Sequence, residues 1–380
     1  AIEAIKESNF NPNVQFKNFG LQKLSTIFNR FKPLFLAFKN KCPKTVNKIS
    51  KLSKIHHKPL TENPLNKATS EIIKDIHWLD NATLYALFKV LSGCYTRYKG
   101  QNSFVYRIRN GKSWIAESKV NIKVCKQNCN ILLNYLKKRF SLKGKKVKLP
   151  SDIIYGLPTS EKMYIGNVPA GTRFFGDKLA VGVYWQNSGG AHDLDLSGIN
   201  INGKVGWNST YNQNNGDLMY SGDITSAPNG AVEYLYANEG LSDVTLIQNN
   251  VFNGNDNCSY KIIIGKGDGV NYDYMMNSEK VFAHIDCQSV QKQSILGLFM
   301  PVQHLQCFVL LNFGAGNLQV SGNSELSDIA TKALYQQWSN GVSFNKLIRI
   351  LGAKIVNDNA DYDLSLDSLE KDSFIKLFCD

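Results

Sequence analysis

Short apolar segments separated by glycine- and asparagine-rich clusters run from about residue 153 to residue 320, and they constrain the fold more than any other feature. Helical periodicity is absent from this stretch, and the segments have the length of strands. Seven or more strands at such spacing are typical of a β-sandwich or barrel. The expected strands are Leu179–Trp185, Val232–Tyr236, Asp243–Ile247, Tyr260–Ile264, Lys280–Ile285, Ser294–Phe299 and Cys307–Leu311.

The segments on either side contain helical patterns instead of short strands, so the sequence predicts an α+β multidomain protein. In the first 80 residues, short amphipathic helices are interrupted by prolines, which leaves a loosely packed arm and a compact domain both open. Near the end, Ser343 is expected to cap a helix that Gly352 ends. The expected parts are a basic, mainly helical region at 1–150 with a β-hairpin near 103–122, an all-β sandwich at 151–322, and a small helical or α/β tail at 323–380.

Charge is divided unevenly along the chain, whose formal net charge is +13. Residues 1–150 contain 30 Lys and Arg against 7 Asp and Glu, whereas the remainder contains 14 against 24. An AT-rich genome would enrich lysine and asparagine throughout the chain, but it does not explain the scarcity of acids in the first part. The asymmetry favours a polyanionic partner for the first part: nucleic acid, an anionic membrane surface or an acidic protein. The candidate polyanion-binding residues are Arg107, Arg109, Lys137, Lys138, Arg139, Lys143, Lys145, Lys146 and Lys148.

Two aspartates stand two positions apart in Asp193-Leu-Asp195, within the densest polar cluster of the chain. Successive side chains of a strand point to opposite faces, so both carboxylates are expected on one face. Like charges at such spacing repel unless a cation lies between them or water screens them. Ca²⁺ takes about six to eight oxygen ligands and suits such carboxylates. A solvated strand face and a calcium site both fit the residues alone.

Three motifs carry a resemblance to the TerD family of tellurium-resistance and general stress proteins. They are Leu157–Thr172, the run Asp193-Leu-Asp-Leu-Ser197, and Ser221-Gly-Asp-Ile-Thr-Ser-Ala-Pro228. The chain is most similar to larger bacterial proteins with a TerD-like region near their C-terminus, and the tail at 344–365 also resembles the end of that group. The resemblance covers roughly residues 150–380 and is faint before Trp114.

The resemblance implies a two-sheet sandwich in which an Asp-x-Asp strand and a Gly-Asp loop bind Ca²⁺. By this resemblance, Asp193 and Asp195 provide the first two carboxylate ligands of the ion and Asp223 provides the third. The acidic loop that follows the Gly-Asp in typical members is missing here, since residues 224–230 contain no carboxylate. Glu233 is the nearest acid and completes the candidate metal ligands.

No catalytic constellation can be assembled from the sequence. A Gly-x-Ser-x-Gly motif is absent, and the six histidines show no metal-ligand spacing. The eight cysteines are scattered, which favours reduced thiols and a cytoplasmic location. No apolar run reaches the ~20 residues of a transmembrane helix. The first residues lack the pattern of a signal peptide, although a longer precursor stays open.

Two functional hypotheses follow from these features. The first is a non-enzymatic, calcium-binding stress or defence protein with a basic arm for a polyanion and with protein partners. The second is a structural or assembly component, for example of a phage-like particle, in which the sandwich is a scaffold and the arm binds nucleic acid or a neighbouring subunit. Peripheral contact of the basic part with an anionic membrane is compatible with either.

Overall fold

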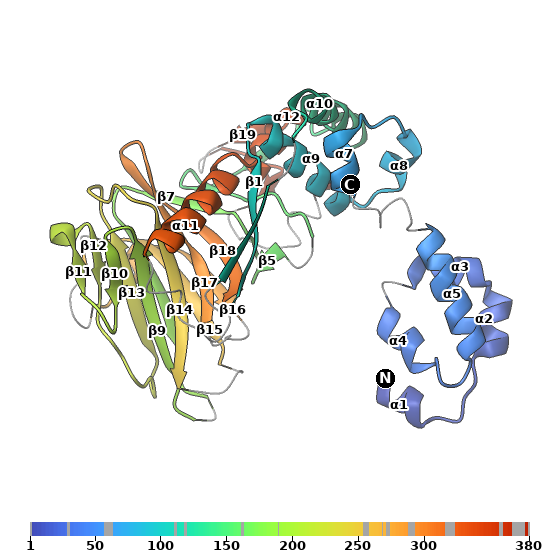
Figure 1. Ribbon diagram of the computed structural model, residues 1–380, viewed down its shortest axis with the longest axis horizontal. Helices are drawn as coiled ribbons and strands as arrows, with labels where there is room; N and C mark the ends of the chain where they lie inside the picture. The colour runs from blue at the N-terminus through green and yellow to red at the C-terminus, as the bar shows by residue number, and fades with distance from the viewer. Residues whose placement is uncertain are drawn as a thin grey trace. The chain divides into compact units, whose positions relative to one another are not determined.

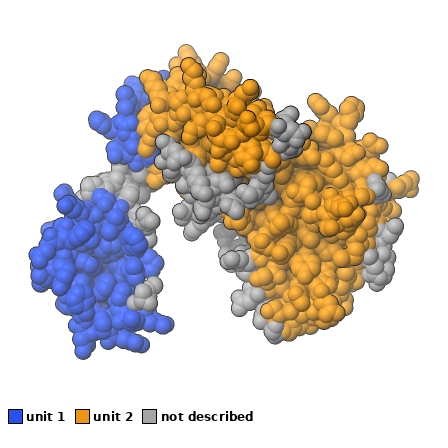
Figure 2. Space-filling view, turned by 180° about the vertical axis from the view of Figure 1, so that it is seen from behind, with its two compact units in different colours: residues 1–82 blue, residues 83–380 orange. Residues whose placement is uncertain are grey.

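The chain divides into two compact units, residues 1–82 and residues 83–380 (Figure 2). Each unit is folded around its own buried side chains. The computed structural model describes residues 2–28, 31–56, 64–109, 112–117, 120–160, 163–188, 190–253, 258–267, 269–270, 274–287, 293–315, 324–356, 360–366 and 377–378.

Unit 1 consists of short helices that bury an aromatic and aliphatic core. Buried Leu24, Phe28, Phe35, Cys42, Val46 and Ile49 form this core, and Phe16, Leu21 and Phe38 pack against it. Of the two alternatives that the sequence left open for the first 80 residues, the structure therefore shows packed helices. The helices are α1 (Ile2–Glu7), α2 (Asn13–Phe19), α3 (Leu21–Ile27), α4 (Lys32–Ala37), α5 (Pro43–His56), α7 (Pro64–Ser70) and α8 (Ile76–Asn81).

Most of unit 2 consists of two antiparallel sheets, which confirms the all-β reading of the central stretch and the α+β class of the chain (Figure 1). We call these two sheets the two-sheet region. The order in the larger sheet is β10 (Gly203–Gly206), β9 (Asp193–Asn200), β14 (Thr245–Asn253), β17 (Gln293–Val302), β18 (Leu305–Ala315), β7 (Arg173–Gly176) and β4 (Ile153–Ile154). The order in the smaller sheet is β11 (Asn212–Gln213), β12 (Leu218–Tyr220), β13 (Ala231–Ala237), β8 (Leu179–Trp185), β15 (Tyr260–Lys266) and β16 (Val281–Cys287).

The two sheets pack face to face. A side chain at Gly198 of β9 would meet Leu218 and Leu235 of the other sheet. Asn200 in the larger sheet donates a hydrogen bond to Gln213 in the smaller sheet at 2.8 Å. Every residue of β9 is buried, so this strand lies deep in the region although it is one strand from the sheet edge.

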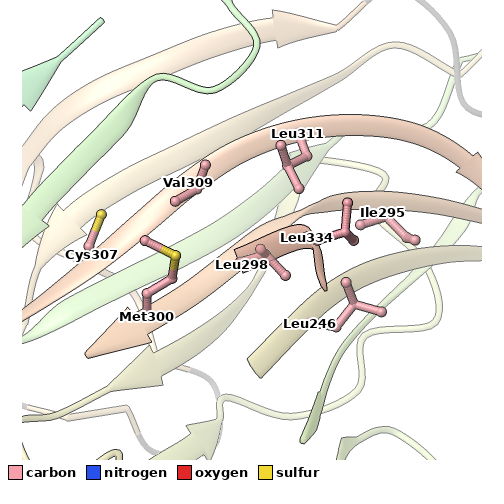
Figure 3. Packing of buried hydrophobic residues seen from close by; sticks show 8 residues of the cluster. All are labelled: Leu246, Ile295, Leu298, Met300, Cys307, Val309, Leu311 and Leu334. Carbon is pink, nitrogen blue, oxygen red and sulfur yellow. The ribbon is translucent and has the colours of Figure 1, made fainter. Parts of the chain in front are cut away.

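The outer face of the larger sheet is covered by helix α11 (Ser324–Ser339) (Figure 1). Figure 3 shows Leu334 of this helix among the strand residues Leu246, Ile295, Leu298, Met300, Cys307, Val309 and Leu311, all of which are buried. The larger sheet is thus apolar on both faces over β14, β17 and β18. This explains the apolar runs Ile295–Met300 in β17 and Cys307–Leu311 in β18.

A second part of unit 2 joins segments from before and after the two-sheet region, and we call it the split helical part. It contains α9 (Leu84–Tyr98), α10 (Ile122–Arg139), α12 (Phe344–Ile350) and a small parallel sheet in which β3 (Lys146–Lys148) lies between β19 (Lys354–Val356) and β20 (Leu364–Ser365). The ring of Phe378 contacts those of Phe88, Phe140 and Phe344 at 5.4–5.9 Å.

The boundaries of these parts differ from those that the sequence suggested. The compact units meet at residue 82 rather than near residue 150. The tail beyond residue 323 does not stand alone, because β19 and β20 both pair with β3. The hairpin of β1 (Ser103–Arg109) and β2 (Lys112–Glu117) is confirmed, and β1 contacts α11 and β18. Its turn residues, 110 and 111, lie outside the described residues.

Capping residues fix the ends of the last described helix. The Ser343 side chain accepts from the Lys346 amide at 3.2 Å, and Gly352, which follows the C-cap residue Leu351, has φ +102°. Both features confirm the sequence prediction for this helix. The expected final helix, capped by Ser365 or Asp367, falls mostly on residues 367–376, outside the described part. Across the described residues, no helix combines the length and apolar character needed to span a membrane.

Candidate metal centre

Three aspartates meet at one end of the two-sheet region. Asp193 and Asp195 belong to β9, whose alternation places both carboxylates on one face, as the period-two spacing predicted. Asp223 lies in the loop that follows β12. One carboxylate oxygen from each residue lies within 4.8 Å of the others. Ca²⁺ ligands lie at ~2.3–2.6 Å from the ion, so oxygens at this separation can share one cation.

The cluster is shielded from solvent, which makes three like charges costly. Asp193 is 5% exposed and Asp195 is 3% exposed. Oδ1 of Asp193 and Oδ1 of Asp223 are buried and have no hydrogen-bond donor within the described structure. Ion pairs in the described part of the chain join Lys261 to Asp286 and Lys266 to Asp152, neither of which includes an aspartate of this cluster. Buried anionic oxygens without donors are the groups that a bound cation would satisfy.

Burial and the repulsion between neighbouring carboxylates raise the pKa values of two aspartates in the cluster. Burial, with the nearby Asp223 carboxylate adding to it, raises the pKa of Asp193 to about 6. Burial and the charges of Asp193 and Asp223 raise the pKa of Asp195 to about 7, against a lowering effect of Lys204. Burial in turn lowers the pKa of Lys204. The cluster therefore binds protons in the absence of a cation, and a divalent ion would replace them.

Glu233, the fourth metal ligand proposed from the sequence, lies outside the group of three. Its carboxylate is fully buried and accepts backbone hydrogen bonds from Leu196 at 2.8 Å and from Ile224 at 2.9 Å. Burial raises the pKa of Glu233 to about 8, although both amides lower it. Because Leu196 follows Asp195 and Ile224 follows Asp223, this side chain holds together the two segments that carry the cluster.

Asn187 connects the loops beside the cluster, and sequence reasoning missed this role. Its Oδ1 accepts from the His192 and Ala227 amides, both at 3.1 Å, and its Nδ2 donates to Ser226 at 3.1 Å. It thereby fixes the residue before Asp193 to the loop that contains Asp223. The only sequence signal for it is its position at the start of the polar cluster, and that signal does not name its partners.

The residues proposed to bind a polyanion lie in α10, in the segment that contains β3, and in β1. Lys137, Lys138 and Arg139 form the exposed last turn of α10, where positive charge also complements the helix dipole. Residues 143–148 form the segment that contains β3, with Lys143 and Lys146 exposed and Lys145 and Lys148 half-buried. Lys148 lies 5.6 Å from the centre of the Tyr362 ring. Arg107 and Arg109 lie in β1, and their side chains are outside the described structure.

The described cysteines, which are all of them except Cys379, are buried. Burial raises the pKa of Cys94 above its ordinary value, and it does the same for Cys125 and Cys129. Such thiols pack as small apolar groups and are poor nucleophiles.

The metal-free protein is expected to lose stability as pH rises from about 4 to 7. The pKa of Asp195 is about 7 in the folded chain and ~3.9 in an unfolded one, so the folded state binds more protons between these values. Asp195 then destabilises the folded state above pH 7 by on the order of 4 kcal/mol. Denaturant unfolding in a chelator at a series of pH values would measure this, and Asp195→Asn should remove the corresponding part of the slope. Identical slopes for the two proteins would contradict the raised pKa.

Comparisons with protein-family models, with curated proteins and with solved structures found no match to this chain.

Proposed function

We propose that the chain is a non-enzymatic, TerD-like stress or defence protein whose two-sheet region binds one Ca²⁺ ion at Asp193, Asp195 and Asp223. The observation that supports this most is the convergence of two buried carboxylates and the half-buried carboxylate of Asp223, with two of their oxygens lacking any donor in the described structure. An uncompensated buried cluster of this kind opposes folding, whereas a cation stabilises it.

The choice of Ca²⁺ rests on the donor chemistry. The three side chains offer only carboxylate oxygens, which suit hard cations, and the cluster contains no histidine or cysteine that would suit zinc. Ca²⁺ accepts irregular sets of oxygen ligands that include backbone carbonyls and water, whereas Mg²⁺ requires a near-octahedral set. The loop at 224–230 has no acid to add. We therefore expect modest affinity, in the range of ~10⁻⁵–10⁻³ M.

Calcium titration by calorimetry would test the proposal. The wild-type chain should bind about one ion, and the double variant Asp193→Asn/Asp195→Asn should bind none. Its matched control is Glu239→Gln/Glu279→Gln, which removes two charges from exposed positions outside the cluster and should leave binding unchanged. At a hundredfold excess over Kd, calcium should stabilise the wild type by about 2.7 kcal/mol. Magnesium should give a smaller effect.

Two results would reject the calcium site. One is the absence of both heat and thermal stabilisation at millimolar calcium. The other is equal binding by the wild type and the double aspartate variant, which would place any bound ion elsewhere. A chain without a calcium response that forms large assemblies in light scattering would instead favour the role of a structural component.

A further inference from the structure

Five side chains from three helices form a continuous network of contacts on the split helical part, and we call it the lysine–tyrosine surface. Tyr95 and Tyr98 belong to the last turn of α9, and Lys99 follows them. Lys126 comes from α10 and Lys346 from α12, which lies more than 200 residues later in the sequence. The surface is therefore assembled by the fold and cannot be seen as a run in the sequence.

The tyrosine rings hold the three lysines in place. Nζ of Lys99 lies 5.9 Å from the centre of the Tyr95 ring and 5.5 Å from that of Tyr98. Nζ of Lys346 lies 4.9 Å from the Tyr95 ring centre and also donates to the Tyr95 hydroxyl. Nζ of Lys126 lies 5.8 Å from the Tyr98 ring centre. The two rings meet edge to face at 6.3 Å. Cation–π contacts position ammonium groups at exposed sites without neutralising them.

The three lysines are exposed, and their helices contain no acid. The sequences of α9, α10 and α12 contain no Asp or Glu, and residues 83–150 contain 16 Lys and Arg against one acid, Glu117. Exposed Lys123, Lys137, Lys138 and Arg349 extend the same charge along α10 and α12. Concentrated positive charge of this kind repels itself unless a polyanion lies against it.

We propose that the lysine–tyrosine surface binds the phosphodiester backbone of nucleic acid. Lysine ammonium groups neutralise phosphates, and tyrosine hydroxyls and half-exposed rings add hydrogen bonds and base contacts. The exposed side of α10 is polar at residues 123, 126, 127, 130, 134 and 137, and its first residue, Ile122, is an exposed apolar side chain. An amphipathic helix that inserts into a membrane needs an apolar face there instead. The surface shares no residue with the carboxylate cluster, so it binds its ligand with or without calcium.

Fluorescence anisotropy of the full chain in a chelator would test this surface. The probes are a labelled single strand of about 20 nucleotides, longer than the ~4–16 nucleotides of a single-strand site, and the matching duplex. Lys99→Gln/Lys126→Gln/Lys346→Gln is expected to weaken binding at least tenfold near 50 mM salt. It should also reduce the slope of log K against log salt by about 2 for the single strand and about 2.7 for the duplex, the values for three lost phosphate contacts.

Two matched variants distinguish binding by this surface from an effect of the chain's net charge. Replacing the same lysines with arginine should keep the affinity within about threefold, because the charges remain. Lys17→Gln/Lys23→Gln/Lys44→Gln removes the same charge from exposed positions of unit 1 and should leave the affinity much less changed. Equal losses in both glutamine variants, or an unchanged salt slope in the first, would overturn the proposal. The proposal would also be overturned if the first glutamine variant lost binding to phosphatidylserine vesicles but kept its affinity for nucleic acid, because that result would assign the surface to an anionic membrane.

Discussion

Gly297→Ala is expected to prevent the two-sheet region from folding stably. Gly297 lies in β17, at the centre of the larger sheet, where the register shifts between Ile295 and Gly297 relative to β18. A Cβ atom there would lie 2.2 Å from the Val309 carbonyl oxygen and 2.5 Å from the Phe308 ring. The oxygen belongs to the backbone of the neighbouring strand, so it cannot move without breaking the sheet pairing. We expect a loss of more than about 3 kcal/mol, at the upper end for a single methyl group.

Thermal unfolding followed by circular dichroism would measure this loss. Gly341→Ala is the matched control, because the nearest atom to its added Cβ lies at 3.4 Å, an ordinary contact distance. The free energy of unfolding of that variant should lie within about 0.5 kcal/mol of the wild-type value. Comparable midpoints for the Gly297 variant and the wild type would show that the strands β17 and β18 are not packed as closely as described.

Glu233→Ala is expected to have the second large effect, on stability and on calcium binding together. The change removes the acceptor of the buried Leu196 amide and of the partly buried Ile224 amide. A buried amide left without an acceptor costs about 1–3 kcal/mol and a partly buried one costs less, so we expect a loss of about 2–4 kcal/mol. The segments of Asp195 and Asp223 would then separate, and calcium affinity should fall although all three ligands remain.

Glu233→Gln distinguishes this bridging role from a role as a ligand. Its carbonyl oxygen can accept from one amide, but its NH₂ group faces the other amide, so an intermediate loss of stability is expected. Glu279→Gln, on an exposed residue, is the control. Unfolding curves and calcium calorimetry on the same samples provide both readouts. If Glu233→Ala lowered calcium affinity without lowering stability, Glu233 would be a ligand rather than a bridge.

The sequence predicted the strands well where local pattern decides the structure. Leu179–Trp185 was expected as a strand and is β8, and the alternation around Asp193 and Asp195 placed both carboxylates on one face. These results depend only on period-two spacing and on turn residues, which act over a few positions. The proximity of Asp223 was implied by a family resemblance rather than by spacing, and the structure brings it within 4.8 Å of the other two.

The parts that could not be predicted depend on contacts between distant segments. Glu233 has the same carboxylate as the three aspartates, and only its position opposite the Leu196 and Ile224 amides gives it a different role. Strand β3 has three residues, too few for a pattern, and its partners lie beyond the two-sheet region. The domain boundary near residue 150 was expected because the composition changes there. The pairing of β3 with β19 and β20 instead joins segments from before and after the two-sheet region in one sheet.

The split helical part also imposes an order on folding during synthesis. The amide of Lys146 donates to the Asp363 carboxylate, 217 positions later, and the chain between them contains the whole two-sheet region. At a synthesis rate of about 5–20 residues per second, Asp363 is synthesised roughly 10–40 s after β3. Lys346, the last lysine of the lysine–tyrosine surface, is synthesised in the same interval. A nascent chain therefore acquires this surface only after the two-sheet region has had time to fold, so the proposed binding of nucleic acid would begin only after Lys346 has been synthesised.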